Sequence, residues 1–147
     1  MTPDLLYRYL HFLGILLASG TLFAETLLLR RRLTGLEIKR VGLIDGAYGA
    51  SILLLVGGGL AQWFVGFKPA EFYTRNPVFL VKVGMVALIG LLSIYPTVWL
   101  IRNRRLPEAE TFAVPDGVRI LVRLEAVFLL VVPLLAVLMA RGVGLKP

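Results

Sequence analysis

Four apolar segments, each long enough to cross a lipid bilayer as a helix, occupy most of this 147-residue chain. A hydrocarbon core of about 30 Å requires about 20 helical residues. The segments that meet this length are residues 5–29, 42–66, 78–101 and 117–140. The sequence therefore predicts an all-α integral membrane bundle of four transmembrane helices. We expect it to form a single domain over residues 1–147, with the lipid bilayer as its main partner.

The composition supports a membrane location and excludes several classes of protein. Hydrophobic residues make up 58% of the chain and charged residues only 17%, which is unusual for a soluble enzyme. The net charge of +7 comes mostly from the short connections between apolar segments, so we attribute it to a membrane surface and expect no nucleic-acid partner. The absence of cysteine excludes disulfides, thiolate metal sites and cysteine nucleophiles.

The distribution of Lys and Arg predicts the orientation of the chain in the membrane. Connections 30–41 and 102–116 hold eight of these residues, whereas the N-terminus, connection 67–77 and the C-terminal tail with Arg141 and Lys146 hold five. The positive-inside rule places the two richer connections in the cytoplasm. We therefore expect a multi-pass protein of the cell inner (plasma) membrane with both termini outside.

Two helix-start signals agree with the hydropathy boundaries. Asn76 before Pro77 is a favourable N-cap followed by proline at the first helical position. Asp116 before Gly117 is a second expected N-cap. These signals predict the starts of the third and fourth helices.

Ionisable residues inside the apolar segments are the candidate functional residues. A charge in hydrocarbon costs several kcal/mol unless it is paired or faces a polar cavity. The candidates are Arg8, His11, Glu25, Asp45, Lys82, Arg119, Arg123 and Glu125. Their positions divide them into an outer and an inner group.

The outer group centres on His11, the only histidine. Five residues of the first segment share one helix stripe through their three- and four-residue spacing, namely His11, Gly14, Ala18, Thr21 and Glu25. The small residues of this stripe either allow close helix packing or leave room for a flat, bulky group beside His11. His11 and Lys82 would share a layer about 6 to 9 Å below the outer surface.

His11 has two interpretations. One is an imidazole that packs against a neighbouring helix through a hydrogen bond, and the other is a proton carrier or an axial ligand of haem iron. In the second case His11 would ligate the metal, while Arg8 and Lys82 would bind the propionates. The expected cofactor is then haem b.

The inner group contains Glu25, Asp45 and Glu125, with Arg119 and Arg123 near the start of the fourth helix. One interpretation is a charge network in which the arginines neutralise the buried acids. The other is a proton or cation relay through Glu25 and Glu125. No sequence feature separates these two.

Six stretches of the chain resemble a family of small, uncharacterised bacterial four-helix membrane proteins. They are residues 9–12, 22–29, 45–49, 72–82, 93–97 and 139–144. More distantly, the layout is similar to HemJ-type protoporphyrinogen oxidases and CopD-like copper-resistance membrane proteins. The HemJ-type enzymes have a first-helix histidine, a later-helix lysine and a helix-four glutamate, matched by His11, Lys82 and Glu125. This resemblance implies haem binding and proton or electron transfer by His11 and Lys82.

These observations lead to one main hypothesis and two alternatives. The main hypothesis is a membrane protein that binds haem or a related tetrapyrrole and has a redox or proton-coupled role. If it is an enzyme, we expect a protoporphyrinogen-oxidase-like oxidoreductase with His11, Lys82 and Glu125 as catalytic residues. A quinone, a respiratory-chain protein and a second copy of the chain are the partners left open. The alternatives are a module that transports copper or another cation past Met85, and a structural assembly subunit.

Overall fold

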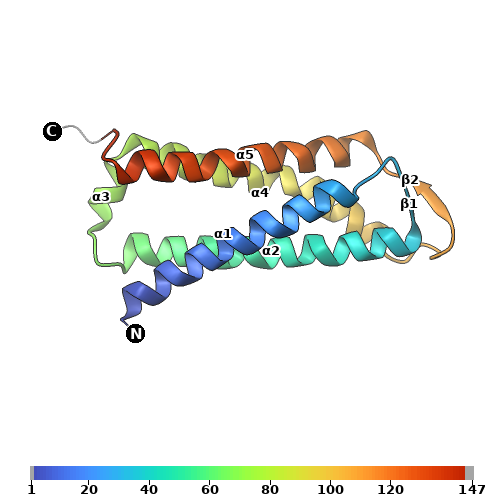
Figure 1. Ribbon diagram of the computed structural model, residues 1–147, viewed down its shortest axis with the longest axis horizontal. Coiled ribbons are helices and arrows are strands. Elements are labelled where there is room, and N and C mark those ends of the chain that lie inside the picture. Colours follow the sequence, from blue (N-terminus) through green and yellow to red (C-terminus); the bar gives the residue numbers. More distant parts are fainter. Residues whose placement is uncertain (1, 145–147) are drawn as a thin grey trace.

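The computed structural model describes residues 2–144 and consists mainly of four long helices (Figure 1). The elements are α1 (Pro3–Leu28), β1 (Arg32–Thr34), α2 (Gly35–Phe64), α3 (Ala70–Thr74), α4 (Pro77–Asn103), β2 (Thr111–Ala113) and α5 (Asp116–Ala140). Helices α1, α2, α4 and α5 are each long and apolar enough to cross a membrane. The predicted four-helix membrane fold is confirmed, and Lys146 lies outside the described residues.

Helix α2 begins at Gly35, seven residues before the apolar segment that was predicted to span the membrane. The cause is a capping box. The Thr34 side chain accepts a hydrogen bond from the Glu37 backbone N–H at 3.2 Å, and the Glu37 carboxylate accepts one from the Thr34 backbone N–H at 2.7 Å. Such a pair satisfies two free donors at the helix start. The first turns of α2 are therefore helical although they are polar.

The other helix starts fall within two residues of their predicted positions. Asn76 caps α4 as expected, because its side chain accepts a hydrogen bond from the Val78 N–H at 2.9 Å and Pro77 follows it. At α5 the N-cap is Pro115, and Asp116 is already inside the helix without a side-chain capping bond. The expectation that Asp116 caps this helix is therefore wrong.

Two short strands join the connection between α1 and α2 to the connection between α4 and α5, a feature that the sequence analysis did not anticipate. Strands β1 and β2 pair antiparallel with Arg32 opposite Ala113 and Thr34 opposite Thr111. We call the end of the bundle with these strands the β end. The opposite end, with the start of α1, the helix α3 and the end of α5, is the α3 end (Figure 1).

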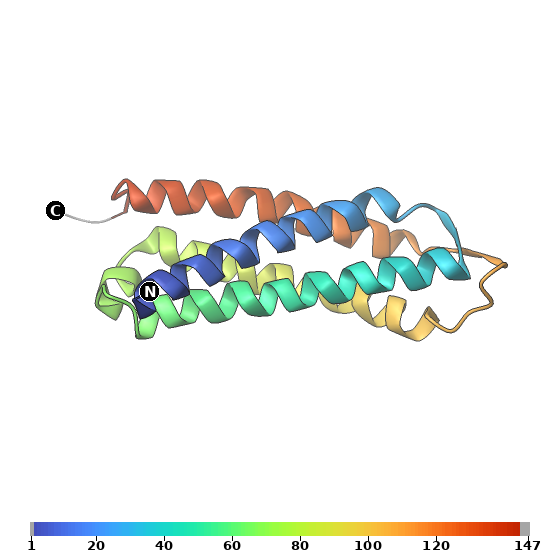
Figure 2. The same cartoon turned by 60° about the horizontal axis from the view of Figure 1, so that its bottom comes forward.

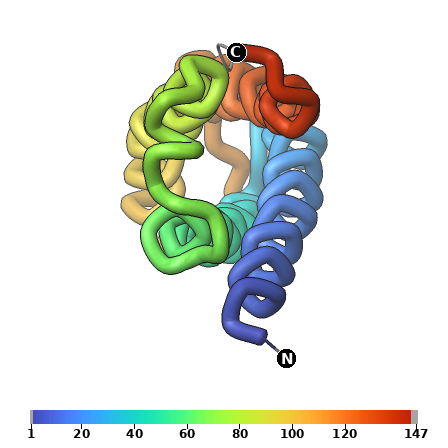
Figure 3. The backbone as a smooth tube through the Cα atoms, turned by 90° about the vertical axis from the view of Figure 1, so that its left-hand side faces the viewer, coloured from blue at the N-terminus to red at the C-terminus, as the bar shows by residue number. Residues whose placement is uncertain are grey.

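The four spanning helices form two pairs. Helix α1 packs mainly on α2, and α4 packs mainly on α5. Figure 2 shows α1 crossing α2 at an angle, and Figure 3, seen from the α3 end, shows the four helices arranged around a central axis. The side-chain packing is uneven along this axis. The first buried residue of α1 is Gly14, and the last of α5 is Val132, so most of the core lies toward the β end.

The outer surface of the bundle is apolar, as expected for contact with lipid. Leu16, Leu53 and Leu130 are 71%, 75% and 79% exposed. Because lipid tails are themselves apolar, burial of such side chains gives little drive for helix association in a bilayer. Close packing between helices must then supply most of the stability.

The closest packing occurs where α1 crosses α2. A Cβ atom placed on Gly14 would lie 2.5 Å from the backbone nitrogen of Leu55, and one on Gly58 would lie 2.8 Å from the backbone nitrogen of His11. Glycine at these two positions lets the backbones approach each other directly. Of the two interpretations of the small stripe, close helix packing is the one seen at Gly14.

We predict that Gly14→Ala destabilises the protein by about 1 to 3 kcal/mol, because the added methyl group overpacks the contact with Leu55. Gly20→Ala is the matched control, since a Cβ atom there meets nothing within 4 Å and alanine is the better helix former. Thermal unfolding in mild detergent measures both. Equal midpoints for the two variants would contradict the packing described for Gly14.

Candidate functional site

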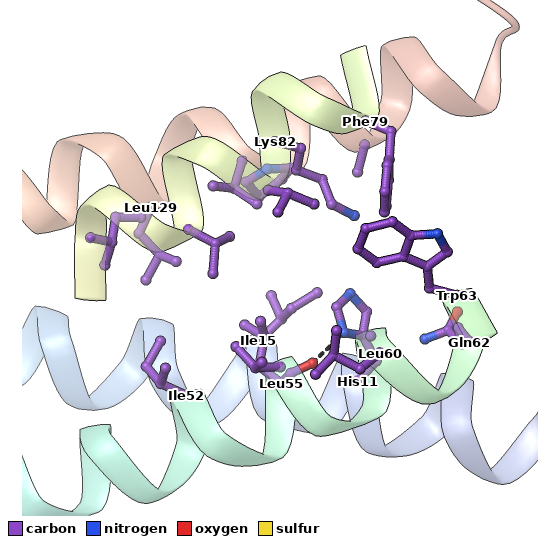
Figure 4. A pocket seen from close by; sticks show the side chains of 18 of the residues that line it. His11, Ile15, Ile52, Leu55, Leu60, Gln62, Trp63, Phe79, Lys82 and Leu129 are labelled. Atoms are coloured by element: carbon purple, nitrogen blue, oxygen red, sulfur yellow. Dashed lines mark hydrogen bonds between the residues drawn. The ribbon is translucent and has the colours of Figure 1, made fainter. Parts of the chain in front are cut away.

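A cavity of about 170 Å³ lies between the two helix pairs, toward the α3 end. Its walls are mostly apolar, and residues from α1, α2, α4 and α5 contribute to it. Five lining side chains carry polar atoms, namely His11, Gln62, Trp63, Tyr73 and Lys82. Figure 4 shows His11 and Lys82 on opposite sides of this space. The structure thus brings His11 and Lys82 to one cavity, as their shared layer predicted.

His11 is held in one orientation by α2. Its Nδ1 lies 2.7 Å from the carbonyl oxygen of Leu55. Since a carbonyl oxygen only accepts, Nδ1 donates, and in the neutral ring Nε2 then carries the free lone pair. The ring nitrogen that does not contact Leu55 points into the cavity (Figure 4). His11 therefore presents an acceptor, or a metal ligand, to whatever occupies this space.

The glycine run of α2 makes room for this ring. A Cβ atom on Gly59 would lie 3.3 Å from the Nδ1 and Cε1 atoms of His11, whereas one on Gly57 would meet nothing within 4 Å. Gly58 and Gly59 thus allow His11 to reach the Leu55 carbonyl. Only Gly57 of these three faces away from α1.

Lys82 supplies a positive charge on the opposite wall. It is half-buried, and its Nζ lies 5.9 Å from the centre of the Phe79 ring. The three ion pairs among the described residues do not involve Lys82. An ammonium group without a carboxylate partner beside an apolar cavity favours a ligand with a negative charge.

Aromatic side chains close the cavity toward the α3 end. The centres of the Trp63 and Phe79 rings lie 4.9 Å apart in an edge-to-face arrangement, and the centres of the Tyr73 and Phe79 rings lie 5.3 Å apart. Burial raises the pKa of the Tyr73 hydroxyl above its ordinary value, so it remains a donor. Sequence analysis did not identify Trp63 and Tyr73 as candidate site residues. Trp63 lies one turn after Gly59, and Tyr73 lies shortly before α4. Neither position in the sequence indicates a cavity.

Arg8 is not part of this cavity. Its Nε lies 2.8 Å from the Asp4 carboxylate, four residues earlier on α1, and both side chains are partly exposed. An exposed pair of this kind contributes little stability. Arg8 is absent from the cavity lining, and the structure does not bring it to His11 and Lys82.

A second group of polar residues lies nearer the β end. Glu25 and Glu125 are each 1% exposed, and Asp45 is 5% exposed. Glu25, Asp45 and Glu125 belong to the buried faces of α1, α2 and α5. The Thr97 hydroxyl donates to Asp45 Oδ1 at 2.8 Å, and Tyr48, which sequence analysis missed, is buried beside Glu125. We call Glu25, Asp45, Tyr48, Thr97 and Glu125 the carboxyl cluster.

The two arginines expected in this network lie elsewhere. Arg119 pairs with Asp116 on its own helix, and the Arg123 side chain is exposed. Among the described residues neither forms an ion pair with the acids of the carboxyl cluster. The reason is helical geometry, because Glu125 faces the core with Val118 and Val122, whereas Arg123 projects from another face.

The part of the chain that the structure describes contains no cluster of side chains that could hold a metal ion by itself. Residues 2–144 contain no group of three His, Asp or Glu side chains that could hold a metal ion. Met85 packs against the apolar core. The structure therefore offers no observation that favours the copper-transport alternative.

The fold and its buried polar groups define a multi-pass integral membrane protein with four spanning helices. Residues 3–144 match the family model described as "Predicted membrane protein (DUF2214)", and the chain belongs to this family. The expected membership of an uncharacterised four-helix membrane family is thereby confirmed. No curated protein and no solved structure matches the chain, so the similarity to HemJ-type and CopD-like proteins stays an expectation.

We predict that Thr97→Val destabilises the protein by about 1 to 3 kcal/mol, because it leaves a buried Asp45 oxygen without its donor. Arg123→Gln, which removes an exposed charge without an acid partner, should change the stability by no more than about 0.5 kcal/mol. Thermal unfolding in detergent measures both variants. A larger loss of stability for Arg123→Gln than for Thr97→Val would instead support the charge network predicted from the sequence.

Proposed function

We propose that this protein binds haem b or a related tetrapyrrole in the cavity between its two helix pairs, where His11 would hold the iron. The observation that carries this proposal is the fixed orientation of the His11 ring. Histidines that ligate metals commonly donate their other ring N–H to a backbone carbonyl, which fixes the tautomer. The 2.7 Å contact between His11 Nδ1 and the Leu55 carbonyl oxygen has this form.

The cavity has the chemistry that a tetrapyrrole requires. Its walls are apolar apart from a few polar side chains, and its volume of about 170 Å³ exceeds the roughly 150 Å³ of an apolar cavity that holds one benzene ring. A full macrocycle needs more width. Because the tight packing is concentrated toward the β end, we expect the α3 end to widen around such a ring.

Lys82 is the residue that would bind the acidic edge of the ligand. Tetrapyrroles of this type carry carboxylate groups, and an ammonium group without a carboxylate partner forms charge-assisted hydrogen bonds with them. Arg8 has no such role in this proposal, because it already pairs with Asp4 outside the cavity. The aromatic rings of Trp63 and Phe79 would bound the ligand on the side nearest the membrane surface.

The proposed role is redox or proton-coupled. Bound haem would supply one-electron chemistry, and the protein would supply binding, orientation and exclusion of water. A quinone or a respiratory-chain protein is the class of partner that would exchange electrons at the membrane. Hydrogen removal from a tetrapyrrole, which the resemblance to HemJ-type enzymes implies, belongs to this proposal as its most specific form.

The test is the absorption spectrum of protein purified in mild detergent from haem-replete cells, recorded before and after dithionite. We expect a Soret band that sharpens on reduction and disappears in His11→Ala. Lys82→Met, which keeps the side-chain length, should weaken haem retention by about tenfold or more, since a hydrogen bond to a charged group contributes about 1.5 to 3 kcal/mol. Haem titration of each variant measures this loss.

Arg8→Gln is the matched control, because it removes a positive charge near the α3 end without touching the cavity. Its haem affinity should equal that of the wild-type protein. A colourless wild-type preparation that also fails to bind added haemin would contradict the proposal. A Soret band unaffected by His11→Ala would exclude His11 as the ligand.

A further inference from the structure

The carboxyl cluster combines one or more polar residues from each of the four spanning helices. Glu25 comes from α1, Asp45 and Tyr48 from α2, Thr97 from α4 and Glu125 from α5. Asp45 is the eleventh residue of α2 and Glu125 the tenth of α5, which places both about 14 Å from the β end at 1.5 Å per residue. The cluster therefore lies at membrane depth.

Three polar atoms of this cluster are buried without a hydrogen-bond partner within the described residues. Glu25 Oε1, Glu125 Oε1 and the Tyr48 hydroxyl are buried without a hydrogen bond, and the Tyr48 side chain is 3% exposed. By contrast, Asp45 Oδ1 accepts a hydrogen bond from the Thr97 hydroxyl. Buried polar atoms without partners are costly, so an additional species is expected to satisfy them.

Within residues 2–144, no base forms an ion pair with these three acids. Toward the cluster, α1 presents Glu25, α2 presents Asp45 and Tyr48, and α5 presents Glu125. Other hydroxyls of α1, α2 and α4 are already used within their own helices, since Thr21, Thr26, Ser51 and Ser93 donate to backbone carbonyls three or four residues earlier. Three carboxylates at this depth cannot all remain ionised, because like charges repel strongly in a medium of low dielectric constant.

We propose that the carboxyl cluster is a proton-binding site, in which Glu25, Asp45 and Glu125 share protons with one another and with Tyr48. The step is the protonation of a carboxylate to a carboxylic acid, which lowers the negative charge of the site by one and turns an acceptor into a donor. The unpartnered oxygens of the neighbouring residues lack a hydrogen-bond donor, and the protonated carboxyl group supplies one. A multidentate metal site is disfavoured by the arrangement of the acids.

This site is separate from the cavity and does not rest on tetrapyrrole binding. The deep wall of the cavity is apolar and includes Ile52, Ile89 and Leu129, so no polar side chain on this wall links His11 to the cluster. Glu25 lies one turn before the end of α1, which makes it the acid nearest to a connection. We therefore assign proton exchange to the β end, through Glu25.

Infrared difference spectroscopy of the protein in lipid nanodiscs, recorded across a pH series, tests this proposal. We expect the carbonyl band of a protonated carboxylic acid at neutral pH, with a shift in heavy water and a loss as the pH rises. Glu25→Gln and Glu125→Gln should each reduce the band. Glu108→Gln is the matched control, because Glu108 is exposed and pairs with Lys39 at the β end, and it should leave the band unchanged.

A second readout covers the case in which the glutamine variants fail to fold. Tyr48→Phe keeps the ring and removes only the hydroxyl, and it should shift the frequency of the band in the folded protein. Absence of the band from the wild-type protein at neutral pH would overturn the proposal, as would a band that Tyr48→Phe leaves unmoved. Loss of the band on adding sodium or potassium ions would also overturn it and identify a cation site instead.

Discussion

The direct contact between the α1 and α2 backbones is the interaction on which the rest of the structure depends. In a bilayer, apolar side chains gain little by leaving lipid for protein, so helices associate through close packing of small residues. Gly14 meets the backbone of Leu55, and Gly58 meets the backbone of His11. This contact joins α1 and α2 into one unit and fixes the height at which His11 faces the Leu55 carbonyl.

The same contact explains why polar groups collect at two depths. With α1 held against α2, the second pair, α4 and α5, packs against the first mostly toward the β end, where Ala18, Val118 and Val122 are almost fully buried. Toward the α3 end the pairs enclose a cavity. His11 and Lys82 line that cavity, whereas Glu25 and Glu125 lie in the packed half and are shielded from both lipid and water. An apolar layer therefore separates the polar residues of the cavity from the carboxyl cluster.

Much of this architecture could be predicted from the sequence, because bilayer thickness restricts the choices. Segment lengths gave the four helices, and Asn76 with Pro77 gave the start of α4. The positions of His11 and Lys82 within their segments predicted that the two residues lie at one depth. In the structure both line one cavity. The early start of α2 was also readable, since Thr34 and Glu37 have capping-box spacing, but their polar surroundings were interpreted as a connection.

The remaining features depend on contacts between residues distant in sequence. The pairing of Arg32–Thr34 with Thr111–Ala113 follows from the bundle bringing two connections together, and three-residue strands have no periodic signal. Arg8 and Arg123 show that depth along a helix does not by itself predict a contact, because Arg8 pairs with Asp4 and Arg123 projects from another face of α5 than Glu125. Tyr48 follows Asp45 by three residues and so shares its face, a signal that could have identified it.

Helix α2 holds His11 through the contact of Nδ1 with the Leu55 carbonyl oxygen, which in a neutral ring leaves Nδ1 protonated and Nε2 open to the cavity. Because His11 is the only histidine, ¹⁵N-histidine labelling gives a single imidazole for NMR in detergent or nanodiscs. We predict a protonated Nδ1 and an unprotonated Nε2 at mildly alkaline pH, and a change confined mainly to Nε2 when haemin is added. A ring protonated on Nε2, with resonances unaffected by haemin, would contradict the account.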